Sequence, residues 1–294
     1  MIKQITFTIL IGLMCSNIHA QKIVWTKKAN LPKPMRGTAI SCNNKIYFME
    51  ANRESGVYEY DPLTDKWQKK TDMITFGWNL NLAEVDGIIY AIGGDPFRDR
   101  NESYDPRNNK WESLTSLPTA RQHSNCCVTN KKIHVLGGIT DWDIKTDKHE
   151  VYDPKTNTWQ IISPLPTKTE GPLVAPVGHS IFVLCGDTMR VYNTLTNEWT
   201  QKTSSPESIR AMFGSIVIDE KIIFPGGQNA NGEASSNVYM YDTKNDTWQK
   251  LNNFPFPFQV AGITTLNNKI YVIGGCNSDW ERFDTVYEGI LKSK

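Results

Sequence analysis

Residues 88–111 read IIYAIGGDPFRDRNESYDPRNNKW, and the features of this stretch recur along the chain. An apolar run leads into a glycine pair, Gly93-Gly94, and Tyr104-Asp105 and Trp111 follow. The same order of Tyr, then Asp or Asn, then Trp is found at Tyr60 and Trp67, Tyr152 and Trp159, Tyr192 and Trp199, and Tyr241 and Trp248. Successive tryptophans lie 44, 48, 40 and 49 residues apart, and a period of this length is typical of a repeat protein.

Each repeat is predicted to form a small antiparallel sheet. The apolar runs are rich in β-branched and aromatic residues, and they lie at 45–49, 88–92, 132–136, 180–184, 221–225 and 269–273. Polar turns such as Asn43-Asn44 and Asp86-Gly87 precede them, and Asn and Gly suit the positive φ of tight hairpins. Asp-Pro steps at 61, 105 and 153 begin another turn before the Trp strand. Each unit is therefore predicted to be a meander of four strands, here called a to d.

This pattern resembles the Kelch repeat, in which a hydrophobic strand ends in Gly-Gly and Tyr-Asp and Trp follow. The resemblance covers nearly the whole chain after residue 20, although the fourth unit keeps only Gly186 of its pair and the first unit has none. It implies an all-β fold, a β-propeller whose radial repetition leaves few exposed sheet edges.

The two ends of the chain predict the number of blades. The last unit, residues 260–291, contains Val286-Tyr287 but no Trp strand, whereas Trp25 has no preceding Tyr-Asp. We therefore expect the strand around Trp25 to supply strand d of the last blade. The result is a six-bladed Kelch-type β-propeller, with its ring closed by the N-terminal strand joining the C-terminal blade. An open array with unpaired ends is the alternative.

The first twenty residues have the pattern of an export signal. Lys3 precedes an apolar run at 5–14, and Ala20 lies at a cleavage point that suits a small residue. The run is shorter than the roughly 20 apolar residues that span a bilayer, and no later run approaches that length. We expect residues 1–20 to be a cleavable signal peptide of a secreted or periplasmic protein, and residues 21–294 to be a single propeller; a buried helix is the alternative for the apolar run.

Composition limits the partners. The chain has 32 Lys and Arg against 31 Asp and Glu, so no basic footprint for nucleic acid is present. After residue 20 five cysteines remain, and an odd number leaves at least one unpaired. The histidines of that part fall on different predicted strands and faces, so we expect no metal site and no cofactor. The domain is expected to be a monomer without a membrane span.

Three tryptophans are not required by the repeat. The scaffold uses six of nine, which leaves Trp78, Trp142 and Trp280. In an up-and-down meander the d–a and b–c connections emerge on one face, and all three tryptophans fall in such connections. Clustered exposed aromatics mark binding surfaces, so we expect these residues to contact a ligand. Additional core packing is the alternative.

A second candidate set lies at the start of each strand a. Counting ten or eleven residues after each scaffold Trp reaches Arg36, Trp78, Arg121, Glu170, Arg210 and Gln259. We expect these positions at the mouth of the central channel, on the face that carries the b–c loops. The Kelch resemblance implies arginines that hold acidic ligands, and the planar guanidinium binds carboxylates through two parallel hydrogen bonds. Alternatively, each arginine pairs with a neighbouring carboxylate and only closes the channel.

Together these features predict a secreted binding or interaction module. The ligand would be polar or acidic, such as a carbohydrate, or a protein partner, and it would bind on the face of the d–a and b–c loops. Alternatively, the chain resembles bacterial sialic-acid mutarotases, which combine a secretion signal with a six-bladed Kelch propeller. Glu170, Asp187 and Arg190 are then the catalytic candidates, because opening and closing a sugar ring needs little more than a carboxylate and an arginine. A structural surface protein without a small-ligand pocket is the third hypothesis.

Overall fold

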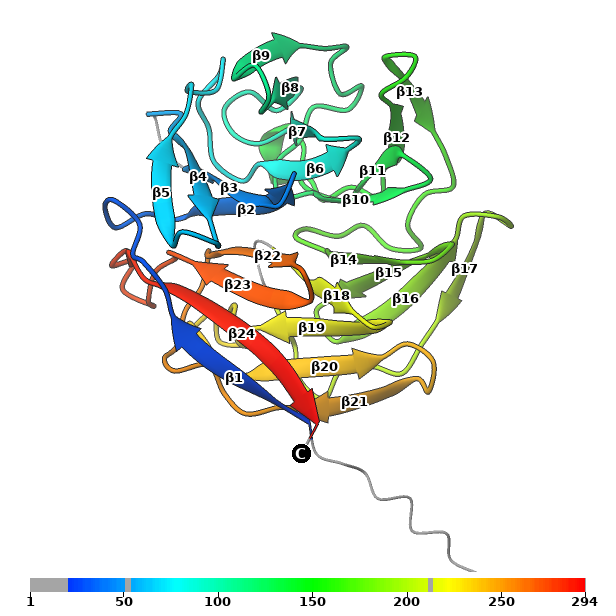
Figure 1. Cartoon of the computed structure of the whole chain (residues 1–294). Helices are drawn as coiled ribbons and strands as arrows, with labels where there is room; N and C mark the ends of the chain where they lie inside the picture. The colour runs from blue at the N-terminus through cyan, green and yellow to red at the C-terminus, as the bar shows by residue number, and fades with distance from the viewer. Residues whose placement is uncertain (1–20, 51–53, 211–213, 294) are drawn as a thin grey trace, which may run out of the picture.

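The computed structural model describes residues 21–50, 54–210 and 214–293, so the expected signal peptide at 1–20 lies outside the described residues. The described chain forms six sheets of four antiparallel strands each. Figure 1 shows these sheets as blades arranged around a common centre, with β2, β6, β10, β14, β18 and β22 innermost. The predicted six-bladed propeller is confirmed.

The strands follow one another from the inside of each blade outward. Blade one contains β2 (Gly37–Cys42), β3 (Lys45–Glu50), β4 (Val57–Asp61) and β5 (Lys66–Lys69). Blade two contains β6 (Asn81–Val85), β7 (Ile88–Ile92), β8 (Asn101–Asp105) and β9 (Lys110–Ser113). Blade three contains β10 (Asn125–Thr129), β11 (Lys132–Leu136), β12 (His149–Asp153) and β13 (Thr158–Ile161), with a 3-10 turn, η1 (Asp141–Asp143), between β11 and β12.

The second half of the ring repeats this order. Blade four contains β14 (Leu173–Val177), β15 (Ser180–Cys185), β16 (Thr188–Asn193) and β17 (Glu198–Gln201). Blade five contains β18 (Ile216–Ile218), β19 (Lys221–Pro225), β20 (Val238–Asp242) and β21 (Thr247–Lys250). Blade six contains β22 (Gly262–Leu266), β23 (Lys269–Ile273) and β24 (Val286–Ser293), and β1 (Gln21–Lys27) is its outermost strand.

The ring closes where the two ends of the chain meet. β1 pairs with β24 in antiparallel register from Gln21 opposite Ser293 to Lys27 opposite Tyr287, and Figure 1 shows the two strands side by side. The side chain of Asn252 accepts a hydrogen bond from the Ile23 amide at 2.7 Å and donates one to the Ile23 carbonyl at 2.9 Å. Strand β1 is therefore held by blade five as well as by its own blade, as ring closure requires.

In most blades the repeated Tyr and Trp, with an Asn or Asp five residues after the Tyr, bond to the preceding blade. Trp199 of blade four is an exception among the described residues, because its Nε1 has no hydrogen-bond partner. In blade two, the Tyr104 hydroxyl donates to Asn109 Oδ1 at 2.7 Å, and Asn109 Oδ1 also accepts from the amide of Thr71 at 3.1 Å. Trp111 Nε1 donates to the carbonyl of the same Thr71 at 3.1 Å. Tyr60, Tyr152, Tyr192 and Tyr241 make the equivalent hydroxyl bonds at 2.6 to 2.7 Å. These side chains are thus needed by the scaffold, as their repetition predicted.

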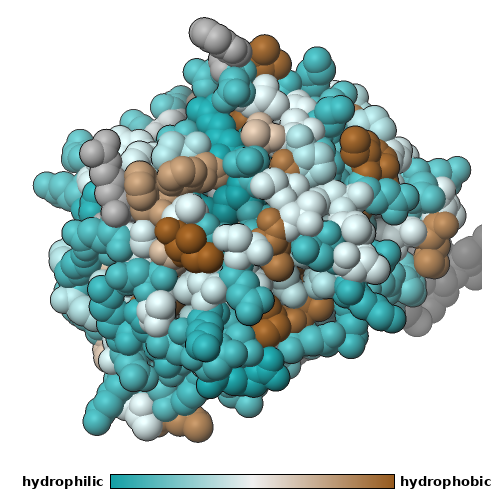
Figure 2. Space-filling view, turned by 90° about the horizontal axis from the view of Figure 1, so that it is seen from above, coloured by the Kyte–Doolittle hydropathy of each residue, from teal (hydrophilic) through white to brown (hydrophobic). Residues whose placement is uncertain are grey.

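The hydrophobic core lies between neighbouring blades. One cluster joins Tyr47 and Met49 of blade one to Leu80, Ile89 and Tyr104 of blade two, and all five are buried. On the outside, Figure 2 shows apolar side chains scattered among hydrophilic ones. No helix of the described chain is long and apolar enough to cross a membrane.

Candidate ligand-binding site

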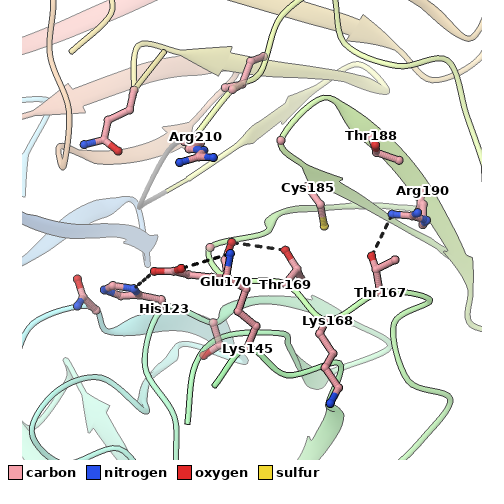
Figure 3. A pocket seen from close by; sticks show the side chains of 16 residues that line it. His123, Lys145, Thr167, Lys168, Thr169, Glu170, Cys185, Thr188, Arg190 and Arg210 are labelled. Carbon is pink, nitrogen blue, oxygen red and sulfur yellow. Dashed lines mark hydrogen bonds and ion pairs between the residues drawn. The ribbon is translucent and has the colours of Figure 1, made fainter. Parts of the chain in front are cut away.

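The length of one loop creates a hollow on the face that carries the d–a and b–c connections. In blade four β15 and β16 are joined by residues 186–187 alone, whereas the b–c connections of the two neighbouring blades span 137–148 and 226–237. The longer loops stand as walls on either side of the short one. Between them lies a pocket of about 460 Å³, here called the blade-four pocket, which Figure 3 shows from close by.

The pocket gathers positive charge from four different elements. Lys145 comes from the b–c loop of blade three, Lys168 from the connection into blade four, Arg190 from β16, and Arg210 from the connection into blade five. Among the described residues that line the pocket, Glu170 supplies the one carboxylate. A chain whose charges nearly cancel therefore concentrates cations in one concave site.

The backbone and a threonine position the two arginines. Arg210 pairs with Gln228 in an isolated antiparallel bridge, where its amide donates to the Gln228 carbonyl at 3.1 Å. Its side chain is exposed and lines the pocket. Arg190 Nη1 donates to Thr167 Oγ1 at 3.3 Å. Both guanidinium groups keep further donors available for a ligand, because each has five N–H groups.

A histidine and a carboxylate face each other in the pocket. His123 Nδ1 lies 2.8 Å from Glu170 Oε1, and Lys145 Nζ lies 3.9 Å from Glu170 Oε2 (Figure 3). The side chains of His123 and Glu170 are 23% and 39% exposed, so a ligand in the pocket can reach both. A carboxylate that accepts from an imidazole fixes the orientation of the ring, which is the arrangement used for proton transfer.

Arg121 does not reach the channel mouth. It is fully buried in blade three, where Nε donates to the Gly137 carbonyl at 2.9 Å and Nη2 to the Val135 carbonyl at 3.1 Å. Nη1 forms an ion pair with the buried carboxylate of Glu150. Burial lowers the pKa of the Arg121 guanidinium, and the charge of Glu150 opposes that shift. The expectation that Arg121 binds a ligand is corrected: its donors are used inside the blade.

The inward direction of the Arg121 side chain has a geometric reason. Arg121 was reached by counting ten residues from Trp111, whereas the other five positions lie eleven residues from their tryptophans. The eleventh residue is Gln122, which pairs with Ile139 as Arg210 pairs with Gln228. A shift of one residue in extended backbone turns the side chain to the opposite face. Gln122 therefore takes the outward position, and it accepts a hydrogen bond from Asn79 Nδ2 at 3.1 Å.

The other members of the channel-mouth set are more dispersed. Gln259 is buried and bonded to the side chain of Gln228 and, through Nε2, to the Asn277 carbonyl at 2.9 Å. Trp78 is half-buried and pairs through its backbone with Asp95. Arg36 lies over the ring of Trp280, with its guanidinium carbon 5.1 Å from the ring centroid.

Two further candidates are Trp142 and Asp187. Trp142 belongs to η1, and its side chain lies outside the described part of the structure. Asp187 is exposed, and its carboxylate accepts from Thr188 Oγ1 at 3.2 Å. The structure thus brings Glu170, Arg190 and Arg210 together, and it leaves Asp187 beside the pocket rather than in it.

Sequence reasoning missed four charged or titratable residues of the pocket, namely His123, Lys145, Lys168 and Cys185. The signal was the missing loop of blade four, since a short connection between two long ones leaves space above a blade. His123 also has φ 51°, as Asn79 has φ 60° and Gly171 φ 59° at equivalent positions. The equivalent Val260 has φ 54°, so the fold imposes this backbone conformation on residues of different kinds.

Residues 19–293 match the family model described as the DUF6242 beta propeller domain. The chain belongs to this family. Among solved structures, the DUF6242 propeller is similar to the one titled "Structure of YjhT", with a TM-score of 0.75 at 18% identity, over 90% of this chain and 98% of that chain. That similarity supports the fold alone.

Curated relatives of the DUF6242 propeller include Kelch-like proteins and a scruin. Kelch-like protein 35 of Mus musculus is 27% identical over 275 residues, which are 92% of this chain and 40% of the mouse protein. Beta-scruin of Limulus polyphemus is 33% identical over 97 residues, or 33% of this chain and 10% of that protein. The chain thus spans less than half of these relatives. They support the predicted Kelch-type propeller and, in general terms, an interaction module.

Proposed function

We propose that the DUF6242 propeller binds a small acidic carbohydrate in the blade-four pocket. The observation that carries this proposal is that Arg190, Arg210 and Lys145 line one concave site whose lining includes one carboxylate among the described residues, with Lys168 at its edge. Arginine forks suit a carboxylate, and lysines add unspecific attraction for an anion. Volumes of about 300–1,000 Å³ are typical of small-molecule sites, and this pocket falls within that range.

The remaining lining residues favour a sugar over an apolar acid. The pocket presents hydroxyl and amide groups from Asn79, Ser124, Thr167, Thr169, Thr188 and Gln228. Hydroxyls and amides both donate and accept, so they match the alternating donors and acceptors of a polyhydroxylated ligand. Glu170 adds an acceptor for a ligand hydroxyl.

Replacing Arg210 by Gln tests the anion site. The variant Arg210→Gln should weaken binding of a carboxylate-bearing sugar by about tenfold to hundredfold, because a hydrogen bond to a charged group contributes roughly 1.5–3 kcal/mol. A glycan array of acidic and neutral saccharides, followed by calorimetric titration, measures the effect. Arg107→Gln is the matched control, since Arg107 pairs with Asp105 in an exposed turn between β8 and β9. Equal affinity of the Arg210 variant and wild type would exclude the proposed site.

The pair of His123 and Glu170 favours mutarotation as a second candidate function. Opening the ring of a cyclic hemiacetal requires removal of a hydroxyl proton and donation of a proton to the ring oxygen, and an oriented imidazole can exchange both. We expect wild type to accelerate anomer exchange of an acidic sugar in NMR, and His123→Ala to lose at least about a hundredfold of that rate. If wild type binds the sugar but does not accelerate anomer exchange, mutarotation is excluded and only the binding function remains.

A further inference from the structure

The loop between β23 and β24 displays an aromatic ring beside the channel mouth. Trp280 is 51% exposed, although a large apolar side chain is usually buried. The guanidinium of Arg36 lies over its ring at 5.1 Å from the centroid, so one face is covered and the ring orientation is fixed. The exposed half of the residue is left for a partner.

The backbone of Trp280 makes this display unfavourable for folding. Trp280 has φ 63°, in the left-handed region where Gly and Asn are favoured and a bulky residue is an outlier. Asn277 imposes the turn: its carbonyl accepts from the Trp280 amide at 3.2 Å, and its Oδ1 accepts from the Glu281 amide at 2.9 Å. Any residue at 280 would take this conformation, and glycine would take it without strain. The turn therefore presents the ring of Trp280, held by Arg36 and half exposed, to a partner.

Hydrogen bonds connect this turn to the blade-four pocket. Gln228, which lines the pocket, donates through its side chain to Gln259 Oε1. Gln259 Nε2 then donates to the Asn277 carbonyl at 2.9 Å, the same carbonyl that holds Trp280. Two side chains therefore link the pocket wall to the turn, and both sites lie on the face that carries the d–a and b–c connections.

We propose that Trp280 and Arg36 form a second subsite that stacks against a sugar ring next to the one in the blade-four pocket, so that the ligand is an acidic oligosaccharide. This inference rests on the proposed function, because it extends the same ligand. The apolar face of a pyranose fits a flat exposed ring, and an aromatic held rigidly in place costs little conformational entropy on binding. The blade-four pocket selects the acidic sugar unit, and the Trp280 subsite selects for the length of the oligosaccharide.

Trp280→Gly tests the second subsite without endangering the fold. Because glycine adopts φ 63° freely, the variant should melt at a temperature equal to or roughly 2–4 °C above that of wild type. It should nevertheless bind acidic trisaccharides at least about tenfold more weakly, while affinity for the matching monosaccharide changes by less than about twofold. The probes are galacturonic acid with its trisaccharide, and N-acetylneuraminic acid with sialyllactose.

Two further variants separate stacking from general effects. Trp280→Phe keeps a flat ring and should retain most of the affinity for trisaccharides. Phe97→Ala is the matched control, because Phe97 is also an exposed aromatic of a b–c loop, with Arg100 lying over its ring at 5.9 Å. Quenching of Trp fluorescence by iodide should decrease when a trisaccharide is added to wild type and remain unchanged with the monosaccharide.

The outcomes distinguish this inference from the proposed function. If Trp280→Gly binds the acidic trisaccharide as wild type does and Arg210→Gln does not bind it, the second subsite is overturned and the anion pocket is supported. Wild type could instead bind neutral maltotriose, with binding lost in Trp280→Gly and unchanged in Arg210→Gln. That result would support the aromatic subsite and overturn the anion pocket. If wild type binds none of these saccharides, both proposals are overturned.

Discussion

At the scale of single residues, the environment decides what a charged or titratable group does. Arg121 and Arg210 belong to the same chemical type, yet one is saturated inside a blade and the other lines a pocket. The histidines divide in the same way. His123 faces Glu170 in the pocket, whereas His134 and His149 are buried in blade three.

The buried histidines form a directed hydrogen-bond chain. His149 Nδ1 must donate to the Ser163 carbonyl, which lies at 3.2 Å, so its Nε2 accepts from His134 Nδ1 at 3.0 Å. His134 Nε2 in turn accepts from the Thr129 hydroxyl at 2.9 Å. Burial lowers the pKa of His134 to about 4 and that of His149 to about 3. Both side chains are therefore neutral in the folded protein near neutral pH.

Because these two buried histidines are neutral, we expect mild acid to destabilise the fold. In the unfolded chain both histidines take up protons below about pH 6.5, and the folded protein resists protonation down to about pH 4. The stability they contribute is complete above pH 6.5 and is lost as the pH falls, by about 1.4 kcal/mol per pH unit for each histidine. Urea unfolding at pH 7, 6 and 5 measures this slope. It should be smaller in His134→Leu/His149→Leu and unchanged in His179→Asn, which alters an exposed histidine; equal slopes in the double variant and wild type would contradict the assignment.

At the scale of elements, loop length makes the site. All six blades share the same four-stranded meander, so the scaffold gives each blade an equivalent upper edge. Blade four differs in one respect, since residues 186–187 alone join β15 to β16. Lys145 and Gln228 reach the pocket from the longer neighbouring loops, and Arg190 is accessible because no loop of its own blade covers it. The pocket is thus formed by a short connection in one blade rather than by an insertion.

At the scale of the whole molecule, stability depends on ring closure. Adjacent blades bury one another's side chains, so a gap at one position exposes two core surfaces. The closing strand β1 contributes seven paired residues, and Trp25 packs edge to face on Phe254 with ring centroids 4.9 Å apart. Its loss removes the outermost strand of blade six and the bonds to Asn252.

Deleting residues 21–27 should therefore lower the melting temperature by about 10 °C or more, because several kcal/mol of pairing and packing are lost. Differential scanning calorimetry measures the change. A permuted chain serves as control: Gln21 lies opposite Ser293, so a short hairpin can attach β1 after β24. This permutant should melt close to wild type, and an unaltered melting temperature in the deletion would contradict closure by β1.

Much of this molecule follows from local patterns in the sequence. The Tyr, Asp and Trp repeats predicted six blades, and the unpaired Trp25 predicted the closing strand, because short-range turn chemistry and alternating hydrophobicity act within each unit. The face of the site also followed, since strand order decides on which side each connection emerges. Glu170 and Arg210 were predicted from their position in the repeat, and Arg190 as the arginine that a mutarotase would need.

The tertiary structure decided which of these candidates share a site. The direction of Arg121 depends on a register difference of one residue, which a count along the chain does not resolve. His123 and Lys145 converge with Glu170 because segments of neighbouring blades meet beside one short loop. The Trp280 ring stays exposed because Asn277 fixes its turn and Arg36 comes to it from another blade. Contacts between distant segments have no local signature, so the repeat determined the scaffold, and the packing of blades determined the site.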